Sequence, residues 1–117
     1  MIVTTTSGAN NCQYCVVAHG AILRIRAKNP LIADQVATNY YKADITPRQK
    51  TMLDFAMKVS LDAKSICDSD FDTLKGHGFS EEDCWDIAAI TAFFGLSNRM
   101  ANFTSMRPND EFYTMGR

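Results

Sequence analysis

Apolar residues recur at helical spacing over most of the chain, and no segment alternates apolar and polar residues over a useful length. This pattern predicts an all-α protein, with helices expected over residues 1–9, 12–27, 30–40, 47–62, 69–75 and 81–106. Residues 1–9 carry no charge and no capping residue before their apolar positions. They are typical of the last part of a helix rather than of a complete one.

Capping residues mark the start of most of the expected helices. Thr46 precedes a proline and Ser80 precedes three acids, so both are predicted N-caps. Asn11 and Asn29 are the favoured N-caps of the second and third helices. Pro108 is expected to close the last helix, because proline cannot continue one.

The last expected helix, over residues 81–106, is apolar on most sides between Ile87 and Leu96. A helix that is apolar nearly all round is expected to be buried. In so short a chain this predicts a subunit interface as well as a core.

Composition limits the function classes that remain. The chain has 117 residues, which predicts one domain over residues 1–117, and a formal net charge of −1 without any run of Lys or Arg. A nucleic-acid partner is therefore not expected. The uncharged stretch Ile87–Asn98 is far too short to span a membrane. Four cysteines without an export signal indicate a reducing compartment, the cytoplasm.

The motif that carries chemistry is Cys12-Gln-Tyr-Cys15-Val-Val-Ala-His19. On a helix, His19 lies one turn after Cys15 on the same face, and Cys12 lies one turn before it. The helix N-terminus and His19 would favour the thiolate of Cys15, the nucleophilic form. Attack on a peroxide would give a sulfenic acid, with which Cys12 could condense to a disulfide. Tyr14, between the two cysteines, could shape access to them.

Other interpretations of the motif remain open. A zinc ion could be held by the two cysteines and His19 with Cys67 or Cys84 as a further ligand, although neither comes as a second ligand pair. The cluster could also be inert packing. A thioredoxin-like site would need a preceding strand, which the pattern lacks. Cys67 and Cys84 themselves are expected to be ordinary small residues.

The segment Ser7–Gly20, with its Cys-x-x-Cys-x-x-x-His motif, resembles the AhpD-like alkylhydroperoxidases of the carboxymuconolactone decarboxylase superfamily, in particular their peroxidase-related members. The tail Arg107–Arg117 is similar to the ending of that same group. The resemblance implies an all-α helical bundle that assembles into trimers or hexamers. It also implies that Cys15 meets the peroxide, that Cys12 resolves the sulfenate, and that His19 belongs to a proton relay.

By the same resemblance, the site holds no metal or organic cofactor. Reducing equivalents would come from a lipoylated protein or another dithiol. The family's relay also uses a glutamate, which by the family pattern would stand just ahead of Met1, whereas this chain has no acid before Asp34. Tyr14 stands where the family often has histidine, and the family's N-terminal helices are lacking. The sequence therefore looks like the C-terminal part of a longer member.

The leading hypothesis is a thiol-dependent peroxidase that reduces hydrogen or organic peroxides through the Cys12–Cys15 pair. One alternative is a non-catalytic helical assembly domain, or a truncated family member. Another is a redox sensor that uses the same two cysteines on a protein substrate. A lactone decarboxylase is a weaker alternative, because that chemistry does not call for a redox Cys-x-x-Cys pair.

Overall fold

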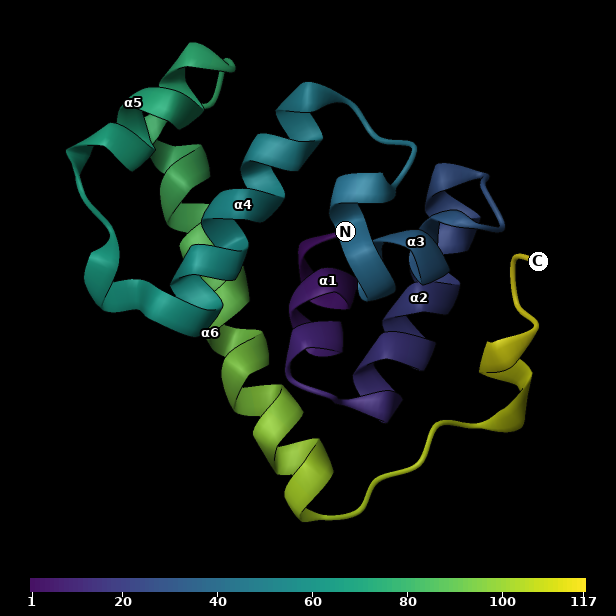
Figure 1. Ribbon diagram of the computed structural model, residues 1–117. Helices are drawn as coiled ribbons and strands as arrows, with labels where there is room; N and C mark the ends of the chain where they lie inside the picture. The colour runs from purple at the N-terminus through teal and green to yellow at the C-terminus, as the bar shows by residue number, and fades with distance from the viewer.

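A computed structural model describes residues 1–117 and is all-helical, which confirms the predicted fold class (Figure 1). The elements are α1 (Ile2–Ala9), α2 (Gln13–Ala27), α3 (Ile32–Asn39), α4 (Pro47–Asp62), α5 (Asp68–Gly76) and α6 (Glu81–Phe103), with short 3₁₀ turns at η1 (Tyr40–Lys42), η2 (Ala63–Ser65) and η3 (Asp110–Tyr113). No helix is both long and apolar enough to cross a membrane.

Helix α1 lies in the middle of the molecule, with α2 and α3 on one side and α4 and α6 on the other (Figure 1). Four consecutive residues of this short helix, Thr4 to Ser7, are buried. Gly8 lets α1 approach α3 closely, because a Cβ atom at this position would collide with the carbonyl oxygen of Ala37. The polar residues of α1 thus face the interior, where each hydroxyl needs a partner.

Two predicted helix starts are confirmed, and two differ from the prediction. Thr46 and Ser80 both cap their helices through capping boxes. The cap of α2 is Cys12 rather than Asn11, which instead takes the left-handed conformation with φ of 53°. Helix α3 begins at Ile32, because the side chain of Asn29 accepts the N–H of Leu31 and holds the chain in a turn.

Helix α6 ends at Phe103, three residues before the predicted end at residue 106. Ser105 adopts the left-handed conformation with φ of 55°, and the N–H of Met106 returns to the carbonyl of Ala101. This closure satisfies a carbonyl that the end of a helix otherwise leaves free. The turn closed by the hydrogen bond from Met106 to Ala101 therefore ends the helix before Pro108 is reached. The prediction that Pro108 closes the helix was wrong.

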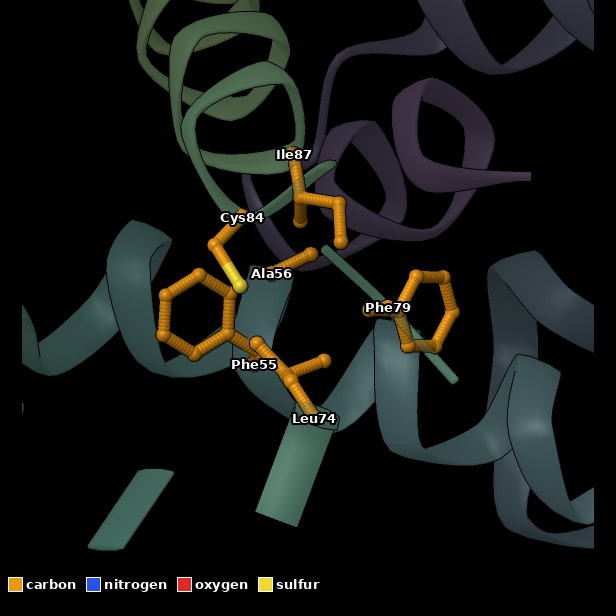
Figure 2. Packing of buried hydrophobic residues seen from close by; sticks show 6 residues of the cluster. All are labelled: Phe55, Ala56, Leu74, Phe79, Cys84 and Ile87. Carbon is orange, nitrogen blue, oxygen red and sulfur yellow. The ribbon is translucent and has the colours of Figure 1, made fainter. Parts of the chain in front are cut away.

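The main apolar core lies between α4, α5 and α6. Its buried residues are shown in Figure 2: Phe55, Ala56, Leu74, Phe79, Cys84 and Ile87. A second cluster joins α3 to α4 through Val36, Tyr40 and Leu53, among others. Cys84 thus serves as a small apolar core residue, as expected, and Cys67 is exposed.

One face of α6 is exposed in this chain. The sequence predicted a subunit interface as well as a core for this helix, and the interface stays a prediction. Phe93, Leu96, Met100 and Phe103 follow one another at spacings of three and four residues, and each side chain is more than half exposed. The opposite face packs on α1 and α4. The spacing and the types of residues along a helix do not show whether its apolar face is buried or exposed, because both kinds of face consist of the same residue types.

The C-terminal tail returns to pack on α2 (Figure 1). Arg24, which is 3% exposed, donates from Nε to the carbonyl of Met115 at 2.9 Å and from Nη2 to that of Phe112 at 2.7 Å. Arg117 forms a two-bond ion pair with Asp34 at 2.8 and 3.0 Å. A buried guanidinium thus holds the tail against the helix that carries the cysteine motif.

Candidate active site

Cys12 and Cys15 lie together at the first turn of α2, and both thiols are free. The sulfur of Cys12 accepts the backbone N–H of Cys15 at 3.4 Å, so the first cysteine caps the helix that carries the second. Each residue is only 1% exposed. The structure therefore places the two cysteines near each other at the start of α2 and buries them.

The turn before α2 fixes this geometry. Asn11 in its left-handed conformation reverses the chain after α1, and the N–H of Cys12 then donates to the carbonyl of Ser7 at 2.9 Å. Asparagine tolerates this conformation better than most residues do. The dithiol site is thereby tied to the buried end of α1.

Helix α6 provides the opposite wall of the site. Ala101 forms one buried apolar cluster with the two cysteines, and Tyr14 of α2 packs against this cluster. Asn98, which is fully buried, accepts a hydrogen bond from the hydroxyl of Ser7 at 2.9 Å.

Burial has the largest effect on the acidity of Cys15. Loss of solvation raises the pKa of this thiol well above its usual value, and the neighbouring Cys12 raises it further. The hydroxyls of Ser97 and Ser7 act in the opposite direction and lower the pKa. In this closed arrangement Cys15 is a protonated thiol at neutral pH. The expected help from the helix N-terminus, about 0.3–1 kcal/mol, does not outweigh burial.

His19 lies one turn after Cys15, as the spacing requires, but no hydrogen bond joins the two side chains. Its half-buried ring instead packs edge-on against Phe94 of α6, with ring centroids 4.8 Å apart and planes at 86°. Burial lowers the pKa of His19. The ring is therefore neutral at pH 7 and can accept a proton.

The zinc interpretation finds no support in the positions of the further cysteines. Cys84 lies in the core between α4, α5 and α6, and Cys67 is exposed at the start of α5. Neither belongs to the cluster of Cys12 and Cys15. No group of three or more His, Cys, Asp or Glu side chains is placed to hold a metal ion.

Sequence reasoning missed the polar residues that surround the thiols. Ser7 lies five residues before the motif, and Ser97 and Asn98 lie almost eighty residues after it. None of these three residues belongs to a recognisable motif of its own. Only the packing of α1 and α2 on α6 brings them close to the cysteines.

Comparison with known proteins shows which solved structures this chain is similar to. No family model matches the chain, and no curated protein matches it. A solved structure named as the alkylhydroperoxidase AhpD core, an uncharacterized peroxidase-related protein from Ralstonia eutropha, is 68% identical over 99% of this chain, with a TM-score of 0.98. An uncharacterized peroxidase-related protein from Silicibacter sp. is 40% identical over 99% of this chain, with a TM-score of 0.96.

This chain spans 61% of the length of each of those two proteins. The likeness extends over all six helices, since it covers 99% of this chain. The predicted place within the wider carboxymuconolactone decarboxylase superfamily stays a prediction. The chain belongs to the AhpD-like, peroxidase-related proteins.

Proposed function

We propose that this chain carries the dithiol site of a peroxidase that reduces hydrogen or organic peroxides. The observation that carries the proposal is the placement of two free thiols on one helix turn, with the sulfur of Cys12 3.4 Å from the backbone nitrogen of Cys15. A Cys-x-x-Cys pair at a helix start is typical of thiol redox chemistry. A relative named as an alkylhydroperoxidase core supports the same reaction class.

The proposed cycle has three steps. The thiolate of Cys15 attacks one peroxide oxygen, so that an S–O bond forms, the O–O bond breaks and the alcohol or water leaves. The thiol of Cys12 then attacks the sulfenic sulfur, an S–S bond forms and water leaves. An external dithiol reduces this disulfide by exchange and becomes oxidised itself. A lipoylated protein or a small dithiol would fill this role, in a reducing compartment such as the cytoplasm.

His19 is proposed to take the proton of Cys15. Its lowered pKa keeps the ring neutral, which is the form that accepts a proton. Because the ring packs on Phe94 and makes no bond to Cys15, proton transfer requires either a turn of the ring or a bridging water. Replacement of His19 by Ala should slow the alkylation of Cys15 near neutral pH. An unchanged alkylation profile would remove His19 from the mechanism.

Burial of Cys15 favours a second candidate, a non-catalytic assembly domain that keeps the fold. The exposed apolar stripe Phe93–Leu96–Met100–Phe103 on α6 gives such a domain a surface for a second copy of the chain. A homo-oligomer, trimeric or hexameric, fits the peroxidase and the assembly domain equally. Turnover therefore decides between them, and oligomeric state does not.

The test is peroxide consumption with a dithiol reductant. Wild-type protein should turn over, Cys15→Ser should not, and Cys12→Ser should complete one round and stop. Cys67→Ser is the matched control, because Cys67 is exposed and lies outside the site. Equal rates for wild type and Cys15→Ser would contradict the proposal and favour the assembly domain. Oxidation without turnover with any dithiol would favour a redox sensor.

A further inference from the structure

Cys12 and Cys15 have almost no contact with solvent in the closed structure. Each residue is 1% exposed, so a peroxide, a dithiol or an alkylating reagent reaches a sulfur atom only after part of the surrounding wall moves. On one side the wall is α1, where the carbonyl of Ser7 accepts the N–H of Cys12 at 2.9 Å. Helix α1 lies in the middle of the molecule (Figure 1), so opening the site there would disrupt the core. The site should therefore open at the opposite wall, on α6.

The last turn of α6, residues 99–103, is weakly attached to the rest of the molecule. Ala101 is its one buried residue and belongs to the cluster of the two cysteines, whereas the residues on either side of it are exposed. A single hydrogen bond joins this turn to another helix. Nδ2 of Asn102 donates to the carbonyl of Asn10 at the end of α1, at 3.3 Å, which is slightly longer than such bonds usually are. A turn with so few contacts needs a further attachment to stay closed.

The C-terminal tail supplies that attachment. It begins at Thr104, directly after the last turn of α6, and returns along α2 (Figure 1). At the first turn of α2, Nε2 of Gln13 donates to the hydroxyl of Tyr113 at 2.9 Å, and Gln13 is the residue next to Cys12. At the last turn of α2, the buried guanidinium of Arg24 donates to two carbonyls of the tail. The tail thus joins the last turn of α6 to both ends of the helix that carries the cysteines.

The attachments of the tail differ in strength. The Gln13–Tyr113 bond and the Arg117–Asp34 ion pair are exposed to solvent, where such contacts contribute little. Arg24 is 3% exposed, and each of its two bonds joins a charged donor to a carbonyl, which makes them the strongest of the set. Loss of these two bonds would free the tail. The last turn of α6 would then be an ordinary helix end, held by one buried side chain and one long hydrogen bond.

We propose that the C-terminal tail is a gate for the dithiol site: docked on α2, it holds the last turn of α6 over Cys12 and Cys15, and its release exposes them. A region held by few buried contacts can open locally while the rest of the protein stays folded. The same opening would admit peroxide and the dithiol reductant, a consequence that rests on the proposed peroxidase function. Exposure of the thiols does not rest on it, because any thiol reagent can measure exposure.

The test is the alkylation rate of each cysteine by iodoacetamide in the reduced protein, resolved by peptide and fragment-ion mass spectrometry. At low reagent concentration, this rate follows the fraction of molecules in which the thiol is exposed. The chain contains its own references. Cys67 is exposed without any opening, and Cys84 lies in the separate core of α4, α5 and α6, which opens only on unfolding. Cys12 and Cys15 report on the gate.

Arg24→Met should raise the alkylation rates of Cys12 and Cys15 about thirtyfold, which corresponds to about 2 kcal/mol in the docking of the tail. The rates at Cys67 and Cys84 should stay unchanged. Unchanged rates at Cys12 and Cys15 would overturn the proposal. Increases no larger than the increase at Cys84 would also overturn it, because they would reflect unfolding of the whole chain.

Two further variants separate the gate from charge and from folding. Arg26→Met removes the same charge from an exposed position on α2 and should leave all rates as in the wild type. Tyr113→Phe removes only the bond to Gln13 at the surface, and it should raise the rates of the two site thiols about two- to fivefold. Equal effects of Arg24→Met and Arg26→Met would show that charge sets the reactivity and would contradict the gate. If Arg24→Met does not fold, unchanged rates in Tyr113→Phe would contradict it.

Peroxide consumption by the wild-type protein is measured beside these rates. If the protein consumes no peroxide but Arg24→Met exposes the thiols as predicted, the peroxidase proposal fails and the gate stands. If the protein is active but Arg24→Met leaves the alkylation rates of the two site thiols unchanged, the gate fails and the peroxidase proposal stands.

Discussion

The attachment of the C-terminal tail to α2 rests on one buried side chain, and its replacement gives the most quantitative prediction. Arg24 donates two hydrogen bonds, to the carbonyls of Phe112 and Met115. The substitution Arg24→Met keeps the apolar part of the side chain and removes the guanidinium. It therefore removes both bonds without opening a large cavity.

Hydrogen bonds to a charged group contribute about 1.5–3 kcal/mol each, so two set an upper limit of roughly 3–6 kcal/mol. Two effects reduce this sum. The freed carbonyls belong to a largely exposed segment and can bind water, and burial of the guanidinium is itself unfavourable, as the lowered pKa of Arg24 shows. We therefore expect a net loss of about 2 kcal/mol for the docked tail, which is a factor of about 30 in its opening equilibrium.

Hydrogen exchange is the decisive assay, because the tail can open without global unfolding. Amides in η3 and at Met115, which are bonded within the tail, should exchange about thirtyfold faster in Arg24→Met. Arg26→Met is the control, since Arg26 lies exposed on the same helix. Equal exchange in the two variants would refute the claim that Arg24 holds the tail.

Three other predictions follow from single contacts. In a chemical denaturation assay, Gly8→Ala should lower the free energy of unfolding by about 1–3 kcal/mol, because its Cβ would meet a backbone carbonyl of α3. Gly76→Ala is the comparison, because a Cβ atom at Gly76 would meet no other atom, and it should raise the free energy of unfolding by up to about 1 kcal/mol. Arg117 lowers the pKa of Asp34, so this pair contributes stability above the unfolded value of about 3.9 and loses it as pH falls through the lower folded value. Arg117→Gln should raise the pKa of Asp34 in a carboxyl NMR titration, and no shift would mean the pair does not form in solution. Leu96→Glu should shift any oligomer toward monomer in sedimentation, since Leu96 is 60% exposed on the apolar stripe of α6.

Local chemistry predicted most of the helices, and its failures have physical reasons. Thr46 and Ser80 cap their helices as predicted, because a capping box needs only residues close in sequence. The start of α2 differs because the thiol of Cys12 takes the capping role and Asn11 is used in the turn before it. The end of α6 differs because Ser105 adopts a left-handed conformation that asparagine or glycine would have signalled more clearly.

The sequence predicted that Cys12 and Cys15 lie close together, but it did not predict what surrounds them. The spacing alone predicts that Cys12 and Cys15 lie near each other, because residues three apart are neighbours on the surface of a helix. Whether Cys15 is acidic depends on its burial and on side chains from other helices, such as Ser7 of α1 and Ser97 of α6. Periodicity also cannot say whether α6 is covered, since the exposed residues of its outer face have the same character as core residues.

The central claim is that Cys12 and Cys15 form a redox pair, and its most direct test is the intact mass after one equivalent of peroxide under non-reducing conditions. The wild-type protein should lose two hydrogens, with the new bond placed between Cys12 and Cys15 by fragmentation. Cys12→Ser should instead gain one oxygen at Cys15. A wild-type mass that does not change, or oxidation confined to the exposed Cys67, would contradict the account.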